Sequence, residues 1–236
     1  MNDNFGVRTF EEEVASVKGL NQFIAKVFGW MFLGLLATAG VAFYVASNET
    51  LIYNIVSNRI LFYGLMIGEL ALVMMLSARI TKLSFPAAMG FFIGYAVLNG
   101  VTLSTLFYAF TGGALTNAFA ITAVTFGVMS IYGYFTQADL TRFRSLLFMG
   151  LIGVVVLSVV NLFLRSSSLE WFVSLIGLFV FLGLTAYDMQ KLKGYYYQTE
   201  GNVALRNNLG VAGALNLYLD FINLFLIFLR IFGRRD

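Results

Sequence analysis

The chain contains neither cysteine nor histidine, and each absence removes a class of chemistry. Without cysteine there is no disulfide framework, no thiol nucleophile and no thiol redox switch. Without histidine the protein lacks the usual metal ligand, the usual general base and the usual sensor of near-neutral pH. A response to physiological pH would have to come from other groups.

Charged residues are also scarce. They make up 11% of the 236 residues, while 59% are hydrophobic, whereas a soluble domain carries about 25% charged residues. The mean hydropathy is +0.83. These values predict an all-α integral membrane protein rather than a soluble fold with a large core. The net charge of +3 does not suggest nucleic-acid binding.

Seven apolar stretches have roughly the 17–25 residues that a membrane-spanning helix needs. They predict seven transmembrane helices within one domain, residues 24–236, at approximately 24–46, 60–80, 87–110, 114–136, 145–165, 171–195 and 209–232. The tripeptide TGG at 111–113 is the only break between the third and fourth stretches.

Residues 1–23 are expected to form a cytoplasmic N-terminal tail with a short amphipathic helix. The segment Thr9-Phe10-Glu11-Glu12 matches a capping box, and apolar residues follow it at helical spacing. A frayed polar tail is the alternative.

The distribution of Lys and Arg predicts the orientation. Ten of these residues lie on the side of the N-terminus and of the loops 2–3, 4–5 and 6–7, and five lie on the other side. Because loops rich in Lys and Arg remain in the cytoplasm, the N-terminus is predicted to be cytoplasmic. Seven spans then place the C-terminus outside. The basic ending GRRD argues against that placement, so a re-entrant last segment is the alternative.

Only three acidic residues lie well inside the apolar stretches, namely Glu69, Asp188 and Asp220. Each costs roughly 2.5–3.5 kcal/mol near the centre of a spanning helix. Such residues usually face the bundle interior and mark ion paths or proton relays. The structural alternative is a buried hydrogen bond that joins two helices, and for Glu69 both interpretations stay open.

Asp220 belongs to a polar stripe. Gly213, Asn216, Asp220 and Asn223 are spaced by 3, 4 and 3 residues and therefore share one helix face. A helix with one polar stripe in an apolar surface belongs in the centre of a bundle, where the stripe lines a wet path or meets another polar group. Asn216 and Asn223, together with Glu69, are therefore candidates for lining an ion path.

The best partner for Asp220 is Asp188, in the preceding, antiparallel stretch. At about 1.5 Å per residue, the two carboxylates differ in depth by roughly one helical turn. In close, poorly solvated contact they would share a proton and titrate as a pair. When that proton leaves, the two charges repel each other or attract a cation, and oxygen ligands favour Ca²⁺ over soft metals. The pair is therefore predicted to be a pH-sensing gate and a transient Ca²⁺ site.

Two basic residues are candidate partners for an aspartate in a closed state. Arg79 ends the second stretch, and Lys191 follows Asp188 by three residues. Membrane anchoring and the positive-inside bias are the alternative explanations for both, and Arg79 is the candidate latch.

Several seven-span classes are excluded. A retinal protein needs a lysine in the last span for its Schiff base, and a zinc hydrolase needs histidines; both are missing. Serines in the spans have no histidine to activate them. An aspartyl intramembrane protease would use two spanning aspartates, but LYLDFIN lacks the GxGD pattern of that class.

The segments GLTAYDMQKLK (183–193) and LNLYLDFINLFLIFLRIFG (215–233) resemble the signature of the Bax-inhibitor-type family, most closely its bacterial inner-membrane branch. SIYGYFTQADLTRF (130–143) is also similar to that family. The resemblance implies seven helices with the seventh at the centre, and a pH-sensitive Ca²⁺ leak in which Asp188 and Asp220 form the responsive pair. Relatives with a leak have an arginine-rich end of the second span, and here that end, LSARITKLS, has Arg79 alone.

The prediction is therefore a non-enzymatic, pH-sensitive calcium leak channel of the cell inner membrane. It needs no cofactor, and its partners are the lipid bilayer, protons and Ca²⁺ as the permeant ion. One alternative is a non-conducting membrane regulator that binds a membrane protease or a cell-death or stress factor. A third hypothesis is a proton-coupled transporter that uses the same carboxylates.

Overall fold

The computed structural model describes residues 3–233, with side chains from residue 15 onward. Within this range the chain is helical, without a strand, and seven helices are long and apolar enough to cross a membrane. This confirms the predicted all-α membrane fold. The elements are α1 (Asp3–Ala46), α2 (Glu49–Ser57), α3 (Arg59–Arg79), α4 (Phe85–Leu103), α5 (Leu106–Ala109), α6 (Gly112–Phe135), the 3₁₀ helix η1 (Leu140–Phe143), α7 (Arg144–Leu164), α8 (Ser167–Gln198) and α9 (Val203–Phe232).

Short polar side chains cap the N-termini of five of these helices, namely α2, α3, α6, α8 and α9. In each case the side chain accepts a hydrogen bond from the backbone N–H three residues later, as found at Asn48, Asn58, Thr111, Ser166 and Asn202. Such N-caps satisfy an N–H group that has no partner within the helix. They allow a new helix to begin at once, and the connections between spans are short as a result.

The N-terminal helix differs from the expectation. A separate short helix before residue 24 is not present, because α1 runs without a break from Asp3 to Ala46. Gly19 lies within this helix, at a point where a Cβ atom would collide with the hydroxyl group of Tyr196 in α8. The side chains of the predicted capping box, Thr9–Glu12, lie outside the described ones.

Helix α2 was not predicted. It lies between the first two spans, and its side chains Ile52 and Ile55 are buried. The segment is only nine residues long, too short for a hydropathy window that searches for spans. Helix α8 extends beyond both ends of the predicted stretch 171–195, and α9 begins before the predicted residue 209. A connection of only four residues, 199–202, joins the two helices.

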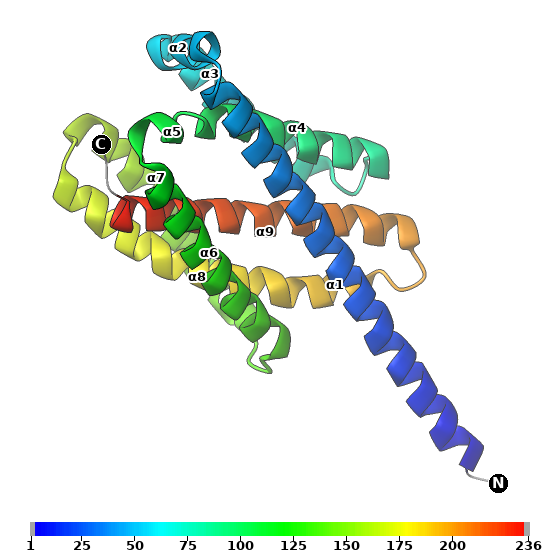
Figure 1. Ribbon diagram of the computed structural model, residues 1–236. Helices are drawn as coiled ribbons and strands as arrows, with labels where there is room; N and C mark the ends of the chain where they lie inside the picture. Colours follow the sequence, from blue (N-terminus) through cyan, green and yellow to red (C-terminus); the bar gives the residue numbers. More distant parts are fainter. Residues whose placement is uncertain (1–2, 234–236) are drawn as a thin grey trace.

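Helix α9 lies in the centre of the bundle (Figure 1). It packs against α1, α4, α6 and α8. Of its most apolar window 67% is buried, compared with 6% for α3 and 0% for Leu140–Leu164, which contains α7. The prediction that the seventh span is central is therefore confirmed, and α3 and α7 are the outer helices.

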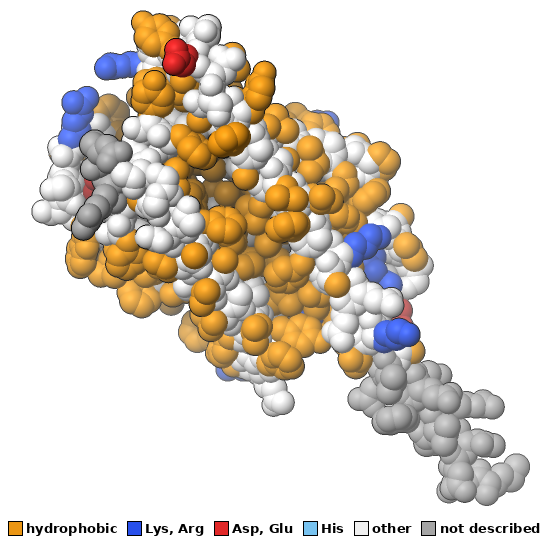
Figure 2. Space-filling model, viewed as in Figure 1, with side chains coloured by type: hydrophobic (Ala, Val, Ile, Leu, Met, Phe, Trp, Pro, Cys, Tyr) orange, Lys and Arg blue, Asp and Glu red, His pale blue; other side chains and the backbone are white. Residues whose placement is uncertain are grey.

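The outer surface has the distribution expected for lipid contact. Figure 2 shows hydrophobic side chains across the middle of the visible face, with Lys and Arg toward its ends. Leu70 in α3 and Phe148 in α7 are 63% and 58% exposed. A continuous apolar surface of this kind suits hydrocarbon rather than water.

Helices α6 and α8 approach each other closely at Gly133. A Cβ atom at this position would collide with the backbone carbonyl of Ala186, which cannot move without displacing α8. Gly127, two turns earlier in α6, has nothing within 4 Å of the corresponding position. The close approach at Gly133 fixes how α8 lies against α6.

We expect Gly133→Ala to lower the thermal stability of the detergent-solubilised protein, because overpacking costs about 1–3 kcal/mol. Gly127→Ala is the matched control, and alanine should be neutral there or stabilise the helix by up to about 1 kcal/mol. Thermal unfolding followed by size-exclusion chromatography measures both. Equal stability of the two variants would contradict the close contact.

Candidate functional site

The two aspartates face the same interface, between α8 and α9. Cβ atoms at Gly213 and Gly177 would meet Leu192 and Ile227, respectively, across this interface. These contacts fix an antiparallel register in which Asp188 is level with Asn216, while Asp220 is level with residues 184–185. The aspartates are thus offset by about one helical turn, roughly 5 Å along the axis.

The polar stripe of α9 is directed at α8. Gly213 packs on Leu192, the Asn216 side chain lies near the Asp188 carboxylate, and Asp220 interacts electrostatically with Asp188. Asn223 uses its amide differently, since its Nδ2 donates to the Leu219 carbonyl of its own helix at 2.8 Å. Asn216 and Asn223 are half-buried and lie about one turn before and one turn after Asp220 in α9.

Asp188 has a positive partner on its own helix. Lys191 Nζ lies 3.6 Å from Asp188 Oδ1, and the side chains are 34% and 12% exposed, respectively. The same ammonium lies 5.8 Å from the ring centre of Tyr187 and 5.5 Å from that of Tyr195. Two aromatic faces and one carboxylate therefore hold this lysine at the edge of the interface.

Asp220 is in a different environment. Its residue exposure is 4%, and its Oδ2 atom has no hydrogen-bond partner among the described residues. No hydrogen bond joins it to Asp188 in the described part of the chain. The arrangement therefore presents one carboxylate paired with Lys191 and a second, deeper carboxylate with a free oxygen. Such a free acceptor can take a proton, a water molecule or a cation.

Glu69 lies in a separate polar network, between α3 and α4. Its Oε1 accepts a hydrogen bond from Thr102 Oγ1 at 2.5 Å, and its Oε2 accepts one from Asn99 Nδ2 at 3.3 Å. Both carboxylate oxygens thus have a protein partner. Glu69 therefore forms hydrogen bonds that join two helices, which is the structural role considered for it in the sequence analysis. Its network is separate from the two aspartates.

The network continues to α9 and α1 through Tyr218. Its hydroxyl group donates to Asn99 Oδ1 at 2.9 Å and lies 2.6 Å from Thr38 Oγ1, which in turn contacts the Ala96 carbonyl at 2.8 Å. Tyr218 is fully buried. The hydroxyl groups of Tyr218 and Thr38 have two protons for these three contacts, so a change in one hydrogen bond requires a change in the others. Together with Glu69, the network joins four spans, α1, α3, α4 and α9.

Arg79, the candidate latch, does not pair with Asp188 or Asp220 in this structure. It is exposed at the end of α3, and among the described residues its side chain has no hydrogen bond or ion pair. Lys191 holds Asp188 instead. The sequence analysis named Lys191 as one of two candidate partners but did not prefer it, because a lysine three residues after an aspartate is common on any helix surface.

Sequence reasoning missed Thr38, Asn99, Thr102 and Tyr218. Each is a common residue type, and their partners come from other helices, so no spacing within one helix marks them. The available signal was the polar pair Asn99 and Thr102, three residues apart in an apolar span. That pair predicts a polar helix face but not its partner.

Comparison with known proteins gives consistent matches over nearly the whole chain. Residues 20–236 match the family model described as "Inhibitor of apoptosis-promoting Bax1". The chain is 49% identical over 219 residues to the inner membrane protein YbhL of Escherichia coli K12, covering 92% of this chain and 93% of YbhL. It is 43% identical over 215 residues to an uncharacterized protein of Borreliella burgdorferi, covering 91% and 93%. The membrane protein SpyM3_0260 of Streptococcus pyogenes is 42% identical over 220 residues, covering 92% and 95%.

The Tyr218 network predicts a stability effect that is separate from ion transport. Tyr218→Phe removes the hydroxyl group that joins Asn99 and Thr38, and we expect a loss of roughly 1–2 kcal/mol because buried partners are left unsatisfied. Tyr132→Phe is the control, since that tyrosine is 49% exposed. Thermal unfolding in detergent measures both variants, and a Tyr218→Phe protein as stable as its control would argue against the network.

Proposed function

Because the chain belongs to the Bax inhibitor family of membrane proteins, we propose that it is a pH-sensitive calcium leak channel gated by Asp188 and Asp220. The single observation that carries the proposal is the free carboxylate oxygen of Asp220, buried in the central helix within electrostatic reach of Asp188. A buried carboxylate without partners is costly, and function is the usual reason to retain one in a membrane.

The proposed gate works by exchange of charge at the α8–α9 interface. At low pH the two carboxylates hold one proton between them and Lys191 neutralises the remaining negative charge, so a cation has no site there. At higher pH that proton leaves, and a cation can take its place. An all-oxygen set of Asp188, Asp220 and Asn216 suits Ca²⁺, which accepts carboxylate and amide oxygens in flexible geometry. We expect the flux to rise with pH.

Lys191 is the proposed closed-state partner of Asp188. Its ammonium and an entering cation compete for the same carboxylate, as expected for ions of the same sign at one site. The 3.6 Å pair supports a conformation in which the path is blocked on this side. In this proposal Lys191 is the closed-state latch, the role for which the sequence analysis named Arg79 as the candidate.

The proposal places the protein in the cell inner membrane with its N-terminus in the cytoplasm. The name of the Escherichia coli relative supports this location, and the excess of Lys and Arg on one side supports the orientation. The partners are lipid, protons and Ca²⁺. The channel acts without a resident cofactor and without catalysis.

Replacement of either aspartate tests the gate. Asp188→Asn and Asp220→Asn remove the charge but keep the side-chain volume, so we expect Ca²⁺ flux into liposomes to fall roughly tenfold or more at neutral pH. The remaining flux should no longer depend on pH. A Ca²⁺-sensitive dye inside liposomes that contain purified protein measures both effects. The flux is recorded from about pH 5 to about pH 8, because burial raises the pKa of carboxylates toward this range.

Asp139→Asn is the matched control, because Asp139 is exposed outside the spans and interacts with Thr141 and Arg142 of the same connection. It should retain the pH dependence of the unmodified protein. Flux that stays pH-dependent in both gate variants would sink the mechanism. A membrane protease that co-purifies with the non-conducting protein would favour the regulator instead.

The identity of the latch gives a second test. Lys191→Gln should increase Ca²⁺ flux by roughly threefold or more at a pH at which the unmodified channel leaks slowly, since Asp188 loses its competing cation. Arg79→Gln should have little effect, because Arg79 makes no described contact with either aspartate. The same liposome assay compares the two variants. The reverse ranking would restore Arg79 as the latch.

A further inference from the structure

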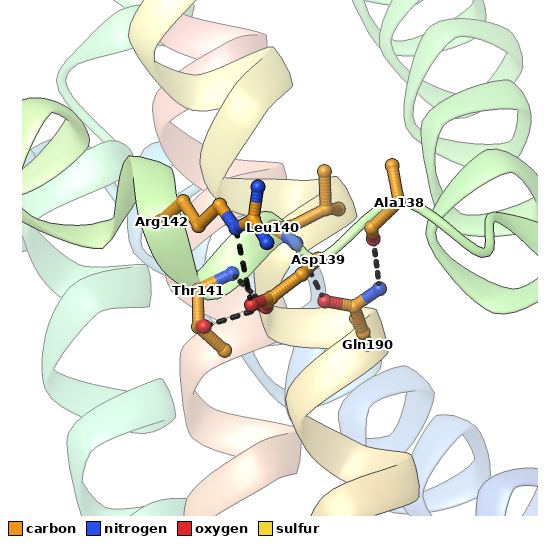
Figure 3. A network of polar contacts seen from close by, with 6 residues as sticks. All are labelled: Ala138, Asp139, Leu140, Thr141, Arg142 and Gln190. Atoms are coloured by element: carbon orange, nitrogen blue, oxygen red, sulfur yellow. Dashed lines mark hydrogen bonds and ion pairs between the residues drawn. The ribbon is translucent and has the colours of Figure 1, made fainter.

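Gln190 of α8 fastens the α6–α7 connection, residues 136–143, to the turn that carries Asp188 (Figure 3). Its Oε1 accepts a hydrogen bond from the backbone N–H of Leu140 at 2.9 Å, and its Nε2 donates to the carbonyl oxygen of Ala138 at 2.8 Å. One amide side chain therefore satisfies a donor and an acceptor of a backbone segment that enters η1. We call this pair of hydrogen bonds, from Gln190 to Ala138 and Leu140, the Gln190 clamp.

Lys193 adds a tie one turn further along α8. Its Nζ donates to the carbonyl oxygen of Tyr134 at 2.8 Å and lies 5.5 Å from the centre of the Tyr134 ring. The Tyr134 carbonyl is among the last of α6, where carbonyl groups have no partner within the helix. The end of α6 and the start of the connection are thus both attached to α8.

These ties lie on the face of α8 opposite to Asp188. Ala186, Gln190 and Lys193 follow at spacings of 4 and 3, and Ala186 packs on Gly133 of α6. Asp188 faces α9. At 100° per residue, Gln190 and Asp188 are about 160° apart around the helix axis. A rotation or shift of this turn therefore moves Asp188 relative to α9 and Gln190 relative to the connection at the same time.

We propose that Gln190 is a positioning residue of the gate, which sets the approach of Asp188 to α9 by clamping the α6–α7 connection. The proposal rests on the proposed function, because it assigns a role to Gln190 through Asp188. The clamp holds the turn in the orientation in which Asp188 meets Lys191 and Asn216. When it is released, α8 turns more freely and Asp188 leaves these partners more often.

The charges around the clamp come from three elements: Asp188, Lys191 and Lys193 on α8, Asp139 and Arg142 on the connection, and Asp220 on α9. The hydroxyl group and the backbone N–H of Thr141 hold the pKa of Asp139 below its usual range. Asp139 therefore stays ionised throughout the neutral range. Its carboxylate is turned toward Thr141 and Arg142 (Figure 3), so it does not make the clamp titrate near neutral pH.

The test compares Gln190→Ala with Gln198→Ala, a control on the same helix whose side chain is exposed. Gln190→Glu is a second variant, which keeps the acceptor for Leu140 and loses the donor to Ala138 when it is ionised. Backbone hydrogen exchange of residues 136–143 and 186–193 is measured by mass spectrometry on full-length protein in lipid nanodiscs. Ca²⁺ flux is measured in liposomes from pH 5 to pH 8, the range used for the gate aspartates.

We expect Gln190→Ala to speed exchange in both segments about five- to tenfold, as for the loss of a hydrogen bond. The pH midpoint of the flux should shift by about half a unit or more. Gln190→Glu should be intermediate, and Gln198→Ala should match the unmodified protein. A merely structural role would lower thermal stability without moving the midpoint.

Two results would overturn the proposal. One is unchanged exchange in both segments of Gln190→Ala, and the other is faster exchange with an unmoved midpoint in a protein that conducts. If the unmodified protein carries no Ca²⁺ at all, the proposed function fails. In that case faster exchange that spreads from the connection to residues 186–193 still supports the clamp on Asp188, and exchange confined to the connection refutes it.

Discussion

An ionisable side chain can remain in the middle of an apolar helix bundle only where protein, rather than lipid, surrounds it. Asp220 imposes this requirement on α9. The helix is enclosed by α1, α4, α6 and α8, while α3 and α7 pack on the outside and present apolar surface to the membrane. The layering of the bundle is thus consistent with the need to shield one carboxylate, and the most apolar span, Leu140–Leu164, is also the least buried.

The polar groups on the two faces of α9 differ in their hydrogen bonding. Tyr218 and Asp220 are two residues apart and so point to nearly opposite sides of the helix. On the Tyr218 side the hydroxyl group has partners in α4 and α1, and both oxygens of Glu69 are bonded. On the Asp220 side a carboxylate oxygen is free. Satisfied bonds hold helices in place, whereas a free buried acceptor is poised to change partners. The Tyr218 side therefore fits a structural role, and the Asp220 side fits a gate.

Hydropathy and spacing predicted the spans, the central seventh helix and the face of α9 that carries Asp220, because each of these depends on the sequence of one helix. The register between helices is not encoded in that way. It follows from close contacts such as Gly213 on Leu192, so the level of Asp188 against α9 could be estimated only roughly. The Gln190 clamp left even less trace, since its partners are backbone groups that every residue type provides. Spacing also could not rank Arg79 against Lys191 as the partner of Asp188, because a lysine three residues after an aspartate is common on any helix surface.

The connections at the predicted cytoplasmic end are fastened to the two helices that carry the aspartates. Gln190 of α8 binds the α6–α7 connection, and Asn208 of α9 donates from Nδ2 to the Leu83 carbonyl in the α3–α4 connection at 2.6 Å. In both cases a side-chain amide from an inner helix binds the backbone of a loop that connects to an outer helix, α7 or α3. A change in charge between Asp188 and Asp220 therefore acts on helices whose ends are attached to their neighbours. In the proposed channel, movement at the carboxylates would have to be shared by these loops, and a local exchange of a proton for a cation would then become a motion of the bundle.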